Sequence, residues 1–123
     1  MEIEFENQKT QKEMCDMKLL TAKIGLSMAK TVKQRYNQIE ACENFKEYMN
    51  TGLGIPHPLS NKLKDYYAIR ITGNYRLIVR PESLSSDKII IKGVLDYHGD
   101  KNEWIIPWIY NTSGRNFKRS FGE

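Results

Sequence analysis

Three side chains that can take part in chemistry follow one another at the end of an apolar segment. Residues 89–95 are apolar apart from Lys92, and Asp96, Tyr97 and His98 come directly after them. A carboxylate, a phenol and an imidazole thus arrive together, and an imidazole can exchange a proton near neutral pH. A histidine at the end of a strand is more often an exposed bystander, so the residues alone leave a catalytic and a structural interpretation open.

Basic charge is concentrated in the segment before these residues. The chain has a net charge of +4 over 123 residues, yet residues 1–50 hold eight basic and eight acidic side chains. Residues 57–80 hold one acidic residue, Asp65, against five cations: Lys62, Lys64, Arg70, Arg76 and Arg80. Such a segment suggests a polyanionic partner, often nucleic acid, although a solvated surface is equally compatible with the charge alone.

Two side chains of the basic segment have simple structural interpretations. Arg76 could pair with Asp96 across a sheet, and His57, which lies between two prolines, could be a turn residue. Lys62 and Lys64 could be solvated loop residues.

Hydrophobic spacing predicts the elements that position these groups. Residues 2–6 alternate charge with apolar side chains, which predicts a short strand. Residues 9–24 and about 27–49 carry apolar stripes at helical spacing, and Gly25 is a plausible stop between them. The glycines and prolines of residues 51–58 end the second helix.

Three more strands are expected after the helices. Residues 66–72 and 75–81 alternate in polarity around a two-residue turn at 73–74, and residues 88–98 are apolar on both faces, as in a central strand. The predicted fold class is α+β, with the order β-α-α-β-β-β and a helical hairpin packed on one face of a small, mostly antiparallel sheet.

Alternation along these strands predicts which side chains share a face. Arg70 and Arg76 fall on the face away from the helices. The period of two places the following residues on one face: Ile90, Lys92, Val94, Asp96 and His98. If that is the same open face, two guanidiniums and an imidazole share one groove. Tyr97 alternates to the other side, unless it swings round at the strand end.

The chain length predicts one domain. No apolar run is long enough to span a membrane, and the N-terminal residues are acidic and polar, so no signal peptide and a cytoplasmic location are expected. Cys15 and Cys42 are expected to be free thiols, because the helical hairpin would hold them at different heights. No Cys/His spacing indicates a metal site.

The sequence "GNYRLIVRP" followed by "DYH" resembles the HigB-type toxins of the RelE/ParE superfamily of bacterial toxin–antitoxin systems. "IEFEN", "IGLSMAKTVKQRYNQIEACENF" and "HPLSNKLKDYYAIRITGNYR" agree with the same family. The resemblance covers about residues 1–98. Each piece alone is weak, but the combination of the His-Pro-Leu turn, the Gly-Asn-Tyr-Arg hairpin and the terminal Asp-Tyr-His is specific.

This resemblance implies a RelE-like fold without metal or cofactor, cleavage of messenger RNA in the ribosomal A site, and inhibition by a HigA-type helix-turn-helix antitoxin whose complex binds operator DNA. By matching motif positions, it implies catalytic roles for His57, Arg76, Asp96, Tyr97 and His98.

Metal-free RNA cleavage uses the 2′-hydroxyl as nucleophile and needs a base, an acid and cations around the phosphate. His98 would be the acid or base, Arg76 would clamp the transition state, and Asp96 would orient His98 or act as base. His57 would be a second proton-transfer group or an RNA contact, and Tyr97 would stack on a base or donate to phosphate. The cations expected to hold the RNA backbone are Lys62, Lys64, Arg70 and Arg80.

Residues 99–123 depart from the family, many of whose members end near the histidine. We expect this extension to pack on or beside the domain formed by residues 1–98. Its apolar run with Trp104 and Trp108 could narrow the groove, or dock on the antitoxin or a second copy. Two other functions remain open: a ParE-type gyrase inhibitor without catalysis, and an inactive module that binds only antitoxin and operator DNA.

Overall fold

The structure is a computed structural model that describes residues 1–98 and 101–107. Strand β1 (Glu2–Phe5) is followed by four helices, α1 (Gln8–Cys15), α2 (Met17–Ile24), α3 (Leu26–Glu40) and α4 (Phe45–Thr51). The second half contains β2 (His57–Pro58), the 3₁₀ turn η1 (Asn61–Leu63), β3 (Tyr67–Thr72), β4 (Tyr75–Pro81), β5 (Lys88–His98) and β6 (Lys101–Ile106). The predicted α+β class is confirmed. The observed order differs from β-α-α-β-β-β, because four helices take the place of two and β2, η1 and β6 are additional.

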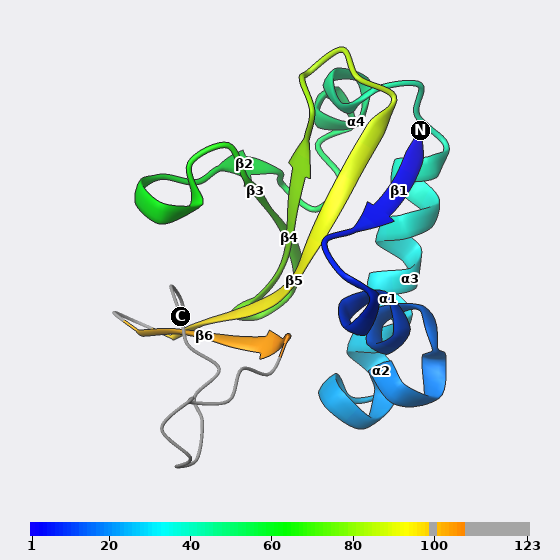
Figure 1. Cartoon of the computed structure of the whole chain (residues 1–123), viewed down its shortest axis with the longest axis vertical. Coiled ribbons are helices and arrows are strands. Elements are labelled where there is room, and N and C mark those ends of the chain that lie inside the picture. The colour runs from blue at the N-terminus through cyan, green and yellow to red at the C-terminus, as the bar shows by residue number, and fades with distance from the viewer. Residues whose placement is uncertain (99–100, 108–123) are drawn as a thin grey trace.

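The long strand β5 organises a six-stranded sheet. The sheet order is β1-β5-β4-β3-β2, and β6 also pairs with β5. One edge of β5 pairs with β4, while the other edge pairs in parallel with β1 over Lys88–Ile91 and antiparallel with β6 over Val94–His98. Helices α1–α3 lie on one side of this twisted sheet, and the segment carrying β2 and η1 projects on the other (Figure 1).

Each of the two predicted helices is broken by a capping residue. Asp16 separates α1 from α2, and its carboxylate accepts from the backbone N–H groups of Lys18 and Leu19 at 2.9 and 3.2 Å. Asn44 begins α4 in the same way by accepting from the N–H of Glu47 at 2.9 Å. Short polar side chains satisfy the first N–H groups of a helix, so the chain restarts at these positions. The stop predicted at Gly25 is confirmed, with φ +88°.

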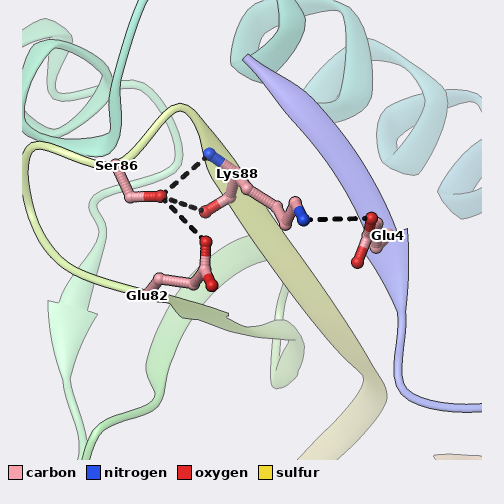
Figure 2. A network of polar contacts seen from close by, with 4 residues as sticks. All are labelled: Glu4, Glu82, Ser86 and Lys88. Carbon is pink, nitrogen blue, oxygen red and sulfur yellow. Dashed lines mark hydrogen bonds and ion pairs between the residues drawn. The ribbon is translucent and has the colours of Figure 1, made fainter.

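A polar network fixes the connection between β4 and β5 beside β1 (Figure 2). The Ser86 hydroxyl accepts from the N–H of Lys88 at 3.1 Å and lies 3.4 Å from the Lys88 carbonyl and from a carboxylate oxygen of Glu82. The Lys88 ammonium lies 3.4 Å from the Glu4 carboxylate, and this bond raises the pKa of Lys88. The network therefore ties the start of β5 to β1.

Both faces of the sheet are packed. On the helix side, the buried members of the main core include Leu20, Val32, Phe45, Ile69 and Leu77. The opposite face carries a smaller cluster, Leu63, Ala68, Ile78, Leu95 and Trp104, against which Leu59, Tyr66 and Tyr97 pack. The second cluster supports the side chains of the candidate site. Within the described residues no helix has the length and apolar character of a membrane span.

Candidate functional site

The β3–β4 hairpin places two arginines side by side on the face away from the helices. Arg70 and Arg76 are direct partners in the antiparallel register, and the side chains that flank them in sequence belong to the helix-side core. Like charges directly opposite each other destabilise a sheet unless something neutralises them. Among the described residues, neither arginine takes part in an ion pair. We call this pair with its surroundings the arginine face.

Arg76 is held in place through only one of its three nitrogen atoms. Its Nη1 donates to the carbonyls of Gly73 at 2.7 Å and Tyr75 at 3.0 Å, and its guanidinium carbon lies 5.5 Å from the centre of the Tyr97 ring. Both hydrogen bonds use Nη1, so the Nη2 and Nε donors can serve a ligand. The hairpin turn thus positions a guanidinium over an aromatic ring.

Tyr97 is tied to the same turn. Its N–H donates to the carbonyl of Asn74 at 2.8 Å, and its ring packs against the second cluster. Burial raises the pKa of the Tyr97 phenol, and the charge of Arg76 partly offsets that rise. The phenol therefore remains a hydrogen-bond donor at neutral pH.

The predicted faces of β5 are wrong beyond Lys92. The register shifts because Ile78 pairs with Gly93 whereas Val79 pairs with Ile91, which leaves Lys92 as an extra residue. This bulge reverses the alternation, and Val94 enters the helix-side core.

As a result, Tyr97 joins the arginine face with Leu95, the register partner of Arg76. Asp96 has Tyr75 as its register partner and is 8% exposed, so it lies on the opposite side of the strand from Arg76. The alternative of an Arg76–Asp96 ion pair is therefore wrong.

The structure describes the side chain of His57, whereas for His98 it describes only the position in β5. His57 is exposed in β2, and its register partner Ala68 belongs to the arginine face. Ala68 lies two residues from Arg70, a step of roughly 7 Å along the strand. His98 ends β5 as the register partner of Lys101. The side chain of His98 lies outside the described part of the chain, so its catalytic role stays a prediction.

The other predicted RNA contacts lie in η1, directly after it, and in β4. Lys62 and Lys64 are exposed on either side of Leu63, whose side chain is buried in the second cluster. Arg80 is half-buried, and its guanidinium carbon lies 5.8 Å from the centre of the Tyr66 ring. Arg80 follows Arg76 by four residues, or roughly 13 Å along β4, so the two guanidiniums do not form one cluster. It lines a separate hollow of about 410 Å³ with the acidic Asp65 and Glu82.

A network of charged and aromatic side chains at this face was not predicted from the sequence. Glu6 accepts from the Tyr66 hydroxyl at 2.5 Å and lies 3.1 Å from the Lys92 ammonium, which in turn lies 5.5 Å from the ring centres of Tyr66 and Trp104. Burial is the largest cause of the raised pKa of Tyr66, followed by Glu6, with Arg80 opposing. Sixty residues separate Glu6 from Tyr66, so no local pattern reveals their contact.

Trp104, one of the two tryptophans of the extension, packs on the sheet. It is 2% exposed and is opposite Leu95 in the register, so it is a structural member of the second cluster. The predictions for Trp108 and the rest of the tail lie outside the described residues. Within residues 1–98 and 101–107, no three histidine, cysteine or acidic side chains are grouped so as to hold a metal ion.

Comparisons with known proteins identify the fold. No protein-family model and no curated protein matches the chain. Solved structures similar to it include a YoeB–YefM complex from Staphylococcus aureus, at 20% identity and a TM-score of 0.54, and a YoeB/ParE toxin from Agrobacterium tumefaciens, at 16% and 0.55. A YoeB dimer from Staphylococcus aureus is similar at 23% and 0.52.

The similarity extends over most of the chain. Each match covers 80% of this chain, together with 97% of the two Staphylococcus aureus chains and 100% of the Agrobacterium tumefaciens chain. At these identities the likeness shows a shared fold, that of YoeB/ParE toxins. The predicted RelE/ParE-type fold is thus confirmed, whereas the HigB-type subgroup stays a prediction.

Proposed function

We propose that this protein is the toxin of a type II toxin–antitoxin system, of HigB type, and that it inhibits translation by cleaving messenger RNA at the ribosome. The observation that carries the proposal is the pairing of Arg70 with Arg76, without a carboxylate partner among the described residues. A phosphate group would supply the missing negative charge. The fold shared with toxin structures and the "DYH" motif support the same conclusion.

In this proposal the RNA's own 2′-hydroxyl attacks the adjacent phosphorus, and the 5′-oxygen leaves. Arg76 binds the phosphate oxygens and stabilises their charge in the transition state. Arg70 neutralises the same or a neighbouring phosphate, and Tyr97 donates to it or stacks on a base. His57 and His98 are the proposed proton-transfer groups. Asp96 lies on the other side of β5 from Arg76, and its proposed role is to orient His98.

The surrounding cations extend the contact with RNA. In this proposal Lys62 and Lys64 hold the RNA backbone. Arg80 is placed roughly 13 Å further along β4, where it can contact a more distant part of the chain. The proposed partners are the ribosome with its messenger RNA, a helix-turn-helix antitoxin, and operator DNA through the antitoxin complex.

A gyrase inhibitor without catalysis is the second candidate. It is favoured by one observation, the similarity to a structure named as a YoeB/ParE toxin. In that case the arginine face would bind a protein or DNA and no RNA would be cut. An inactive module that binds only antitoxin and operator DNA would likewise leave messenger RNA intact.

Mapping of messenger cleavage sites after brief induction tests the proposal. Wild type should produce new 5′ ends within translated messages. Arg76→Ala should lower cleavage by about 10²-fold, and Arg76→Lys, which keeps the charge but loses the fork, should retain an intermediate level. Lys46→Ala, an exposed lysine on α4, is the matched control and should cleave like wild type. Intact messages together with gyrase-linked DNA breaks would establish the second candidate instead.

A further inference from the structure

The loop between α4 and β2 presents two aliphatic side chains to solvent. Leu53 is 41% exposed and Ile55 is 64% exposed. Ile55 has φ +47°, a left-handed conformation that branched side chains rarely adopt. Strained residues persist only where the surroundings hold them, and they gather at functional positions. We call Leu53 and Ile55 the apolar knob.

The backbone of the loop is locked by hydrogen bonds. Leu53 accepts from the buried Tyr48 hydroxyl at 2.6 Å, and its own N–H donates to the Thr51 hydroxyl at 3.1 Å. Ile55 donates to the Gly52 carbonyl at 3.0 Å, and its carbonyl lies 3.3 Å from Nδ1 of His57. These hydrogen bonds fix the backbone that carries the two exposed side chains.

A clamp from α3 fixes the loop against β3. The N–H of Arg70 donates to the Gly54 carbonyl at 2.7 Å, and Arg35 Nε donates to the Arg70 carbonyl at 2.8 Å. A Cβ atom at Gly54 would lie 2.5 Å from a methyl carbon of Ile69 and 2.9 Å from Arg35 Nε, so only glycine fits. The apolar knob is thus fastened directly beside Arg70.

We propose that the apolar knob is the anchor of a protein partner whose surface has an apolar pocket edged by carboxylates; this inference rests on the proposed function, under which that partner is the antitoxin. Aliphatic side chains offer nothing to phosphates, whereas rigid exposed ones fill pockets in protein interfaces. The flanking charge is positive, from Arg70 and Arg35, and neither forms an ion pair among the described residues. A partner seated on the knob would reach Arg70 and so neutralise the toxin by competing with RNA.

The test uses Ile55→Asn, because asparagine tolerates the left-handed conformation and removes the aliphatic anchor. Leu84→Asn is the matched control, since Leu84 is 45% exposed in the β4–β5 loop, which contacts the start of α4 rather than its end. The probe is the purified helix-turn-helix protein encoded beside this gene. We expect Ile55→Asn to melt no lower than wild type and to bind the probe about tenfold or more weakly, with Leu84→Asn unchanged. Leu53→Asn should weaken binding in the same direction.

In cells, Ile55→Asn should remain toxic but escape neutralisation by the co-expressed probe. Unchanged affinity for the probe would overturn the inference, as would lost toxicity without antitoxin, which would assign the knob to the ribosome. A change in self-association with unchanged affinity would assign it to a second copy and would also overturn it. If wild type without antitoxin were not toxic, the proposed function itself would be contradicted. The toxicity of wild type therefore distinguishes a failure of the proposed function from a failure of this inference.

Discussion

Gly93 should be the least replaceable glycine of the sheet. It sits at the bulge of β5 with φ +155°, and a Cβ atom built there would lie 1.9 Å from the carbonyl oxygen of Ile106. Carbon and oxygen in a sheet normally approach to about 3.3 Å, so the end of β6 would have to move by roughly 1.4 Å. The Gly93→Ala substitution therefore separates β6 from β5 where Val94 pairs with Ile106.

The expected loss of stability follows from two contributions. Ile106 is fully buried, and exposing such a side chain costs about 1.5–3 kcal/mol. Alanine at this φ adds strain of about 1–3 kcal/mol. We expect Gly93→Ala to lower the free energy of unfolding by about 4 kcal/mol, a large fraction of the roughly 5–15 kcal/mol typical of a domain.

Urea unfolding followed by far-ultraviolet circular dichroism measures this loss. The matched control is Gly52→Ala, since Gly52 also has a positive φ, +71°, but no atom lies within 4 Å of the position that its Cβ would take. The control should lose about 1 kcal/mol from backbone strain alone. If Gly93→Ala lost no more than Gly52→Ala, the close packing of β6 on β5, and with it the support of the second cluster by Trp104, would be refuted.

Two further predictions concern pH and salt. Burial raises the pKa of the Tyr48 phenol from 10.0 to about 12, so up to about 3 kcal/mol of stability that is present below pH 10 should be lost as the pH rises through 12. Tyr48→Phe should flatten this alkaline loss in unfolding curves, and an equally steep loss would contradict the assignment. Binding to ribosomes or RNA should weaken with salt, and Arg70→Ala should reduce the slope of log K against log salt by about 0.7. An unchanged slope would mean that Arg70 does not contact phosphate.

The hairpin and its arginines could be predicted from the sequence because their signals are local. Alternation in β3 and β4 puts both arginines on the face away from the helices. The turn at residues 73–74 alone would pair Arg70 with Leu77, and a register shift between Arg70 and Thr72 brings Arg70 opposite Arg76 instead. The breaks at Asp16 and Asn44 escape prediction for the opposite reason. The apolar stripes continue across both positions at helical spacing, so periodicity hides a cap whose only signal is one short polar side chain.

The faces of β5 needed information that alternation does not contain. A glycine inside a strand pattern can mark a bulge or the close approach of another backbone, and Gly93 does both. That signal is present in the sequence, but its effect on Tyr97 and Asp96 depends on where the register shifts. Contacts such as Glu6 with Tyr66 could not be predicted, because they join segments sixty residues apart.

The bulge also links the architecture to the proposed chemistry. With unbroken alternation, Tyr97 would face the helices and Asp96 would share the side of Arg76, where it could neutralise the guanidinium. The extra residue at Lys92 reverses both placements, so Tyr97 lies under Arg76 while Asp96 pairs in register with Tyr75. A guanidinium without a neighbouring carboxylate keeps its attraction for an external anion. One extra residue in β5 thus decides between a structural ion pair at Arg76 and the proposed phosphate site, and this residue lies next to Gly93.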